Sequence, residues 1–316
     1  MAVNERAAKV EYVEVGPERA GQRLDNFLMQ RLRNVPRSLV YRIVRKGEVR
    51  VNRGRVKPDY RLCSGDTVRV PPVRVSAPSP AADGALAKVL ATRIVHEDDS
   101  LLVLNKPAGA AVHGGTGISA GVIETLRSMR PQWRDLELVH RLDRATSGCL
   151  LLARHRQALT HFNALLRRRE VDKRYLALVA GQWPHDMREV DAPLAREQAG
   201  PGQARDMGVD EAGREALTRF ELLQSLPGAS LVEVTIVTGR MHQIRVHAAH
   251  AGHPVAGDDR YGEPGFNRRL KALGLRRMFL HAHRITLADP AGESMTFEAP
   301  LDDDLRGVLD ALESGE

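Results

Sequence analysis

The chain has 316 residues, 42% of them hydrophobic and 28% charged, and its 47 Lys and Arg against 40 Asp and Glu give a formal net charge of +7. This length and composition are typical of a globular protein of two domains with a substantial core, and they exclude collagen-like and fully disordered chains. No apolar run approaches the roughly 18 residues of a membrane span, and the N-terminal residues lack the apolar segment of a signal peptide, so we expect a cytoplasmic protein. Two cysteines, Cys63 and Cys149, are too few for a disulfide framework, and we expect both to be buried.

The positive charge is concentrated in one segment. Residues 21–74 hold 14 Lys or Arg and 4 Asp or Glu, a net charge of +10, which leaves a net charge of −3 on the rest of the chain. A patch of one sign predicts a polyanionic partner, because a merely solvated surface carries charges of mixed sign. Nucleic acid is the first candidate. An anionic membrane surface is the second, and it is disfavoured because the sequence shows neither an apolar insertion face nor a lipidation signal.

The N-terminal part of the chain predicts a polar leader followed by a small domain. Residues 1–18 carry no clear structural pattern, and the domain extends over residues 19–75. Residues 23–32 place apolar side chains on one helical face, and Ser38 is suited to cap a second helix over residues 39–46, which Gly47 would end. Two alternating segments then predict the strands of a hairpin, at residues 48–52 and 66–71.

The string RLDNFLMQRLRNVPRSLVYRIVRKGEVRVN, followed by GDTVRV, resembles the S4 RNA-binding domain. The resemblance implies contacts with RNA phosphates, which position an RNA without selecting a base. The cations that we assign to these contacts are Arg37, Arg42, Arg45, Lys46, Arg50 and Arg53.

Residues 76–86 predict a linker, because they are rich in Pro, Ala, Ser and Gly. The larger domain, residues 87–316, mixes strand patterns at 100–106, 173–181 and 230–239 with a helical pattern at 158–169 and an acidic C-terminal helix. No regular alternation of strand and helix is present. We therefore predict an α+β domain built on a mainly antiparallel mixed sheet.

The segment VHRLDRATSGCLLLAR, residues 139–154, holds the main candidate for chemistry. Asp143 lies between Arg141 and Arg144, whose guanidinium groups favour the ionised carboxylate, in a loop that enters an apolar strand. An aspartate in a loop is most often only a turn or cap residue. The surrounding motifs decide between these interpretations.

HRLDRATSG resembles the catalytic motif of the RluA family of pseudouridine synthases. Further similarities to that family follow in the order NKPAGAAVH, KRYLALVAG, TGRMHQIRVH, GDDRYG and FLHAHRI, so the resemblance covers nearly the whole larger domain. With the S4-like segment in front, it implies isomerisation of specific uridines to pseudouridine in 23S ribosomal RNA, after the target base is flipped out. The implied partner is 23S ribosomal RNA or the assembling large subunit, and the implied enzyme is a monomer without a cofactor or metal.

The resemblance also implies roles for individual residues. Asp143 would be the catalytic carboxylate, Tyr175 an aromatic ring against the target base, and Arg240 the cation that pairs with Asp143. The carboxylate could attack the base, attack the sugar or abstract a sugar proton, and the sequence leaves these routes open. The residues assigned to substrate binding are Arg141, which would help displace the base, Leu280, which would line the pocket, and His140.

Two other interpretations deserve comparison with an RNA-modifying enzyme. A non-catalytic RNA-binding factor would not need Asp143, Tyr175 and Arg240 together, and a nucleoside hydrolase would release the base instead of reattaching it. A zinc site is disfavoured because the histidines after TGR lack the H-E-x-x-H spacing and paired cysteines. We expect most of those histidines to lie on helix surfaces, at caps or against RNA. They are His242, His247, His250, His253, His281 and His283.

Overall fold

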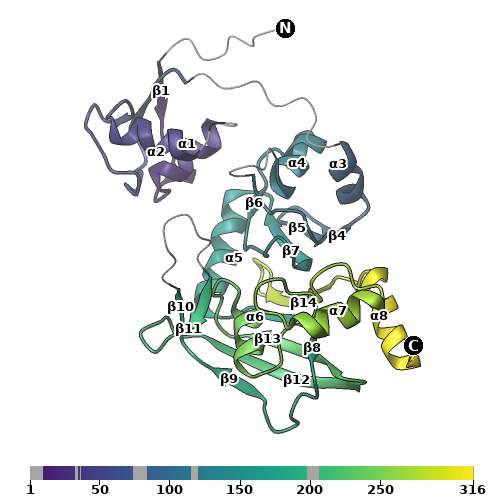
Figure 1. The fold of residues 1–316 in the computed structure, drawn as a ribbon. Helices are drawn as coiled ribbons and strands as arrows, with labels where there is room; N and C mark the ends of the chain where they lie inside the picture. The colour runs from purple at the N-terminus through teal and green to yellow at the C-terminus, as the bar shows by residue number, and fades with distance from the viewer. Residues whose placement is uncertain are drawn as a thin grey trace. The chain divides into compact units, whose positions relative to one another are not determined.

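The computed structural model describes residues 10–32, 35, 37–73, 84–114, 120–197 and 206–315. The chain forms two compact units, one made chiefly of residues 1–82 and the other of residues 83–114 and 120–316 (Figure 1). Each unit has its own hydrophobic core, so each is described by itself.

Unit 1 packs two helices against a three-stranded antiparallel sheet in the order β1-β3-β2. Its elements are β1 (Glu11–Glu14), the 3-10 turn η1 (Pro17–Arg19), α1 (Leu24–Arg31), α2 (Arg37–Arg45), β2 (Arg50–Val51) and β3 (Thr67–Val70). The prediction of an unstructured leader over residues 1–18 is wrong for β1, which pairs along the whole of β3. The reason lies in the alternation of Val13 and Val15 with glutamates, which turns both valines toward the core of unit 1.

The two helices of unit 1 confirm the apolar pattern of the sequence. Gly47 has a φ of +72°, and this left-handed conformation ends the second helix as expected. That helix begins at Arg37, so Ser38 lies inside it and is not the residue that precedes it. The buried side chains that join the helices are Leu24, Phe27, Leu28, Val40, Ile43 and Val44.

The expected linker over residues 76–86 falls mostly outside the described residues. Its C-terminal boundary is wrong, because helix α3 (Gly84–Ala91) already begins at residue 84. Leu90 of this helix is fully buried in the core of unit 2. Leu86 packs against the same core, which explains why residues 84–86 belong to the folded unit.

Unit 2 is built on a ten-stranded mixed sheet (Figure 1). Its main strand order is β4-β5-β7-β14-β8-β13-β12-β9, with β15 beside β14 and β6 beside β7. Among the described strands only the β7–β14 pair is parallel, which confirms the expected α+β fold on a mainly antiparallel sheet. The strands are β4 (Ile94–Glu97), β5 (Leu101–Lys106), β6 (Glu137–Leu138), β7 (Ser147–Ala153), β8 (Asp172–Ala180), β9 (Glu189–Asp191), β12 (Leu217–Leu226), β13 (Ala229–Ile236), β14 (Leu280–Ala288) and β15 (Ser294–Glu298).

Helices and a short hairpin complete unit 2. The helix α5 packs Leu159, Phe162 and Leu165 against one face of β5 and β7, and α8 buries Leu305, Val308 and Leu312, as their sequence patterns indicate. The remaining elements are the two-stranded pair β10 (Leu194–Arg196) and β11 (Met207–Val209), the 3-10 turn η2 (Pro131–Trp133), and the helices α4 (Val122–Met129), α5 (Arg156–Arg168), α6 (Gln243–His250), α7 (Pro264–Ala272) and α8 (Asp303–Ser314). Within the described ranges, no helix has the length and hydropathy needed to cross a membrane.

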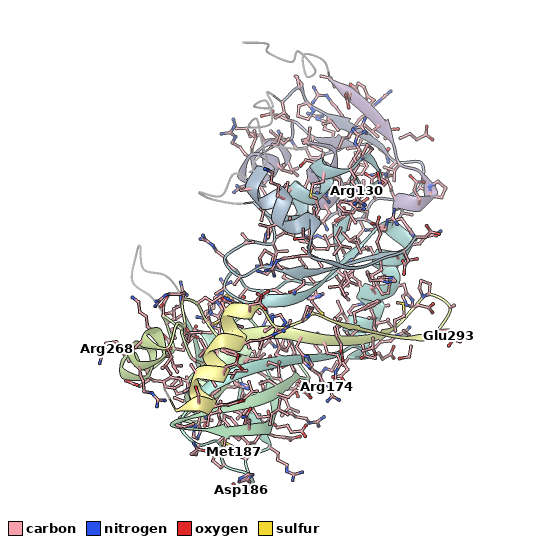
Figure 2. The ribbon with its side chains drawn as sticks, turned by 90° about the vertical axis from the view of Figure 1, so that its right-hand side faces the viewer. Arg130, Arg174, Asp186, Met187, Arg268 and Glu293 are labelled. Carbon is pink, nitrogen blue, oxygen red and sulfur yellow. The ribbon has the colours of Figure 1, made fainter. Side chains whose placement is uncertain are left out.

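The side chains of strand β8 alternate between the two faces of the sheet. Tyr175 turns toward the main apolar core, whereas its neighbour Arg174 turns to the opposite face, because successive side chains of a strand alternate. There Nη1 of Arg174, labelled in Figure 2, donates to Oε2 of the buried Glu233 at 2.6 Å. The face that carries Tyr175 is therefore the one on which a site with the proposed residues can form.

The two cysteines differ in environment. Cys149 on β7 is buried, as expected, and burial raises the pKa of its thiol to about 12. Cys63 is exposed, so the expectation of burial is wrong for this residue. It lies in the turn before β3, where its amide donates to the Asp66 carboxylate at 2.8 Å and its side chain is left outside the core.

Candidate active site

Asp143 lies in the loop between β6 and β7, and backbone contacts fix this loop against the one after β5. The amide of Thr146 donates to the carbonyl of Asp143 at 3.1 Å. The amide of Gly109 donates to the carbonyl of Arg144, and Nε of Arg144 donates back to the carbonyl of Gly109, both at 2.8 Å. The Asp143 side chain stays 34% exposed, so the loop holds its backbone while leaving the carboxylate accessible.

A buried lysine donates hydrogen bonds to the backbone of the Asp143 loop and of the loop after β5. Lys106, at the end of β5, is fully buried, and its Nζ donates to the carbonyls of Pro107 and Ala110 at 2.9 Å and of Arg144 at 3.3 Å. Burial lowers the pKa of Lys106 to about 7, while the negative charge of Asp143 acts in the opposite direction. The NKPAG motif therefore contributes a structural cation to the Asp143 loop, a role that the sequence did not indicate.

Two cationic or polar side chains approach the Asp143 carboxylate. Nη1 of Arg245 and Nε2 of His242 each lie 3.8 Å from Oδ2 of Asp143. Both come from the start of α6, Arg245 from inside the helix and His242 from the residue before it. The start of α6 thus presents two side-chain nitrogens to one carboxylate oxygen of Asp143.

Arg245 is itself held by a buried carboxylate. Its Nε and Nη2 donate to Asp258 at 2.6 and 2.7 Å, a bidentate pair in which the Asp258 side chain is fully buried. Burial would raise the pKa of Asp258, but the hydrogen bonds from Arg245 and from backbone amides bring it below its ordinary value. The ring of Tyr261 lies 4.9 Å from the Arg245 guanidinium. The remaining nitrogen, Nη1, is thereby aimed at Asp143.

The expected pairing of Arg240 with Asp143 is wrong. Nε of Arg240 donates to the carbonyl of Glu215 at 2.9 Å, and its amide donates to Gln243 Oε1 at 3.0 Å. Arg240 precedes the helix and turns away, whereas Arg245 lies inside the first turn and faces the loop. Both arginines belong to TGRMHQIRVH, so the motif contained the cation that approaches Asp143, and the choice between the two was mistaken.

Tyr175 and Leu280 lie together on the apolar side of the site. Tyr175 on β8 and Leu280 on β14 belong to the same buried cluster as Leu142, the residue before Asp143. Leu280 pairs with Ala177, two residues along the strand from Tyr175, which makes the two side chains diagonal neighbours on one face. Burial first, and then the charge of Asp143, raise the pKa of Tyr175. An aromatic ring and an apolar wall thus adjoin the carboxylate.

The other two expected substrate-binding residues have different surroundings. Arg141 is exposed and makes no ion pair with any residue that the structure describes. His140 accepts a hydrogen bond at Nε2 from the amide of Leu151 at 3.2 Å, and burial lowers its pKa to about 4. This contact makes His140 a neutral tie between the loop and β7, and its role in binding substrate stays a prediction.

Two of the six histidines depart from the expected surface or cap positions, whereas His250 is exposed on α6 and His242 occupies the N-cap position of that helix, as expected. His247 and His281 are fully buried, and His281 Nδ1 lies 2.8 Å from the hydroxyl of Ser147, at the end of the Asp143 loop. That hydroxyl also accepts from Nη1 of Arg277 at 3.0 Å. Over the described ranges no three His, Cys, Asp or Glu side chains are grouped as metal ligands. His247 and His281 are therefore core residues, and His281 also contacts the Ser147 side chain at the end of the Asp143 loop.

Unit 1 presents the basic side chains expected for RNA contacts. Arg42, Arg45, Lys46, Arg50 and Arg53 are all exposed, and no carboxylate among the described residues pairs with them. The contacts that they make are with carbonyls, such as Nε of Arg45 with Tyr41 at 3.3 Å and Nη1 of Arg50 with Arg53 at 3.2 Å. Carbonyls orient these side chains without neutralising their charge. The side chain of Arg37 lies outside the described residues.

Comparison with known proteins identifies the family. Residues 100–250 match the family described as RNA pseudouridylate synthase, and residues 22–68 match the S4 domain. The chain is 53% identical over 307 residues to the ribosomal large subunit pseudouridine synthase C of Yersinia pestis, with 96% of each chain covered. It belongs to the RNA pseudouridylate synthase family.

Other relatives of this pseudouridylate synthase agree in sequence and fold. The protein of the same name from Escherichia coli O157:H7 is 51% identical over 309 residues, covering 96% of this chain and 97% of the relative. The solved structure of human RNA pseudouridylate synthase domain containing 4 has 28% identity and a TM-score of 0.60, covering 72% of this chain and 96% of that chain. The expected resemblance to pseudouridine synthases that carry an N-terminal S4 domain is confirmed.

Proposed function

We propose that this pseudouridine synthase acts on specific uridines of 23S ribosomal RNA, with Asp143 as its catalytic carboxylate. The observation that carries the assignment is the meeting of an accessible carboxylate with Arg245 on one side and the Tyr175 ring on the other. The substrate follows from relatives of about 50% identity that are named ribosomal large subunit pseudouridine synthase C. We further propose that the enzyme acts as a monomer in the cytoplasm.

The reaction needs only groups that this site holds. The C1′–N1 glycosidic bond of uridine breaks, the uracil turns, and a C1′–C5 bond forms, while the proton leaving C5 is balanced by a proton gained at N1. The product is an isomer of the substrate, so no oxidant, reductant or transferred group is consumed. The Asp143 carboxylate can serve by attacking the base, by attacking the sugar or by removing a sugar proton.

A uridine in folded RNA must leave its stack before the carboxylate can reach it. Unstacking costs on the order of a few kcal/mol, which stacking on an aromatic side chain partly returns. Tyr175 is placed to receive the flipped uracil beside Leu280, and Arg141 is an exposed cation on the same loop as Asp143, suited to fill the vacated position.

A direct assay tests the proposed substrate. Purified protein is incubated with a 23S ribosomal RNA transcript in EDTA, and pseudouridine is mapped by carbodiimide-dependent stops of reverse transcription. We expect stops at a small number of uridines and no release of free uracil. Absence of stops from protein that is folded and binds RNA would reject the proposed substrate, and release of uracil would indicate a hydrolase.

The basic surface of unit 1 predicts a salt-dependent contribution to RNA affinity. Changing Arg42, Arg45 and Lys46 together to Gln should reduce the slope of log K against log salt by about 2 to 3, since each lost phosphate contact removes about 0.7 to 0.9. The single-turnover rate at saturating RNA should stay near that of the unchanged protein, because these residues belong to unit 1 and the proposed catalytic groups to unit 2.

A matched variant controls for loss of charge alone. Lys88, Arg276 and Arg306 are exposed cations of unit 2, and changing them together to Gln removes the same total charge. A control variant whose salt slope falls as far as that of the unit 1 variant would contradict a specific role for unit 1. Titration of RNA binding at four or more salt concentrations provides the comparison.

A further inference from the structure

His242 has a left-handed backbone conformation that few non-glycine residues adopt. It is one of four described non-glycine residues with positive φ, at φ +56° and ψ +18°, and it immediately precedes α6. Gly adopts this conformation without steric cost, whereas any other residue does so at some cost. Strain of this kind clusters at functional sites, where the surrounding structure holds it in place. The imidazole side chain, and not the backbone conformation, is therefore the reason to look for a role of His at this position.

The imidazole is fixed at both of its nitrogens. Its side chain is 14% exposed, with Nε2 3.8 Å from Oδ2 of Asp143 and Nδ1 3.0 Å from the hydroxyl of Tyr261. The Tyr261 oxygen accepts from the amide of Met207 at 3.0 Å, so its own proton is available to donate to Nδ1. A neutral imidazole that accepts at Nδ1 carries its proton on Nε2, and this N–H is on the side of Asp143.

The charged surroundings of His242 favour this neutral form. Burial lowers the pKa of His242 most, and the nearby Arg245 and Arg260 lower it further, whereas Asp143 and Asp258 act in the opposite direction. Arg245 already supplies a positive charge at the carboxylate. The imidazole can therefore supply a directed hydrogen-bond donor instead of a second charge.

The two side chains approach the same oxygen of Asp143. Nη1 of Arg245 and Nε2 of His242 each lie 3.8 Å from Oδ2. Oδ2 is thus the oxygen to which each side chain makes its shortest contact, and no described residue donates a hydrogen bond to Oδ1. Oδ2 is the carboxylate oxygen that faces Arg245 and His242, and Oδ1 is the oxygen that stays available to the nucleotide.

We propose that His242, oriented by Tyr261, is a positioning residue that acts with Arg245 to hold Oδ2 of Asp143 and leaves Oδ1 as the reacting oxygen. This inference rests on the proposed role of Asp143 in uridine isomerisation. It is independent of the route by which the carboxylate acts, because each route requires one carboxylate oxygen to be directed at the bound nucleoside. Misplacement of a reacting group by about 1 Å can cost about 10²-fold in rate.

Two substitutions at His242 separate positioning from a purely structural role. In His242→Gln the amide nitrogen can take the place of Nε2 and still donate to Asp143. In His242→Asn the shorter amide lies nearer the place of Nδ1, so it can contact Tyr261 but does not reach Asp143. Asn, like His, is among the non-glycine residues found most often in the left-handed conformation, so the backbone should be preserved. The two variants thus preserve opposite contacts of the ring.

The experiment measures thermal stability, RNA affinity and single-turnover rate at saturating RNA in the full-length protein. We expect His242→Asn to keep its stability and RNA affinity and to lose about 10²-fold in rate. We expect His242→Gln to retain a rate within about tenfold of the unchanged enzyme, and Tyr261→Phe, which loses only the hydroxyl that orients the ring, to fall between the two. The control is His250→Gln at the exposed end of α6, whose rate should not change.

The possible outcomes distinguish this proposal from the function on which it depends. A normal rate in His242→Asn would overturn the positioning role, and so would equal losses of rate in the Asn and Gln variants. If Asp143→Asn is inactive while His242→Asn is fully active, only the positioning role fails. If Asp143→Asn is active, the assignment of the catalytic carboxylate fails first and the positioning role fails with it.

Discussion

Asp143→Asn should lower the single-turnover rate of pseudouridine formation by at least about 10⁴-fold, an effect of the size seen when a residue essential to the chemical step is removed. The amide keeps the shape of the side chain and removes its charge and its nucleophilic or basic oxygen. RNA affinity should change little, because phosphate contacts from the basic surface dominate binding. A quench-flow or manual time course at saturating RNA, together with a binding titration, measures both quantities.

A second carboxylate provides the control for this substitution. Asp310 is exposed on α8 and is not among the residues of the candidate site, so Asp310→Asn changes the net charge equally without touching the site. Its rate should match that of the unchanged enzyme. Substantial turnover by Asp143→Asn protein free of wild-type contamination would move the chemistry to another group.

Arg245→Gln should lower both the stability of the protein and its single-turnover rate. Arg240→Gln should have little effect on either quantity. Removing one partner of a buried ion pair costs about 3–5 kcal/mol, since Asp258 would be left as an uncompensated buried charge. The rate should fall as well, because Arg245 is the arginine that approaches Asp143. Chemical denaturation and single-turnover kinetics on both variants provide the comparison.

A double variant separates loss of stability from loss of catalysis. In Arg245→Met with Asp258→Asn the buried charge is removed along with its partner, and the Asn oxygen can still accept from the amides of Arg260 and Tyr261. Most of the stability should return while the rate stays low. Recovery of the rate with the stability would show that Arg245 acts only by holding the fold, and a large loss of rate in Arg240→Gln would restore the pairing expected from the sequence.

Much of the fold could be predicted because the strongest patterns are local. The helices of unit 1, the strands β5, β8 and β13 and the helices α5 and α8 all follow from apolar periodicity or β-branched content. The strand β1 was missed because four residues of alternation in a polar segment are a weak signal, and it is stabilised by pairing with β3, more than fifty residues away. The start of α3 was missed because small residues suit linkers and helices alike.

The site could be predicted as a set of motifs but not as a set of contacts. The motifs supplied Asp143, Tyr175 and Leu280, which the structure brings to one face. They could not decide which arginine of TGRMHQIRVH faces the carboxylate, because that depends on where α6 begins. A usable signal was present, since Arg245 lies between Ile244 and Val246 in an apolar helical turn, where a buried arginine requires a partner such as Asp258.

Other contacts join residues that are distant in the sequence or chemically ordinary. His242 meets Tyr261 across nineteen residues, and Lys106 reaches the carbonyl of Arg144 across thirty-eight. A histidine in a basic motif resembles a surface or RNA-contacting residue, and a lysine beside a proline resembles a loop residue. Only the folded sheet, which brings the ends of β5, β7 and β8 together, shows that these side chains surround one carboxylate.

The most direct test of the central claim is a map of pseudouridine in large-subunit ribosomal RNA from cells that lack this gene. The map is compared with those of the same cells carrying the unchanged gene or the Asp143→Asn gene. The proposed function predicts that specific uridines lose their modification in the deletion, regain it with the unchanged gene and stay unmodified with Asp143→Asn. An unaltered map in the deletion, or full restoration by Asp143→Asn, would contradict it.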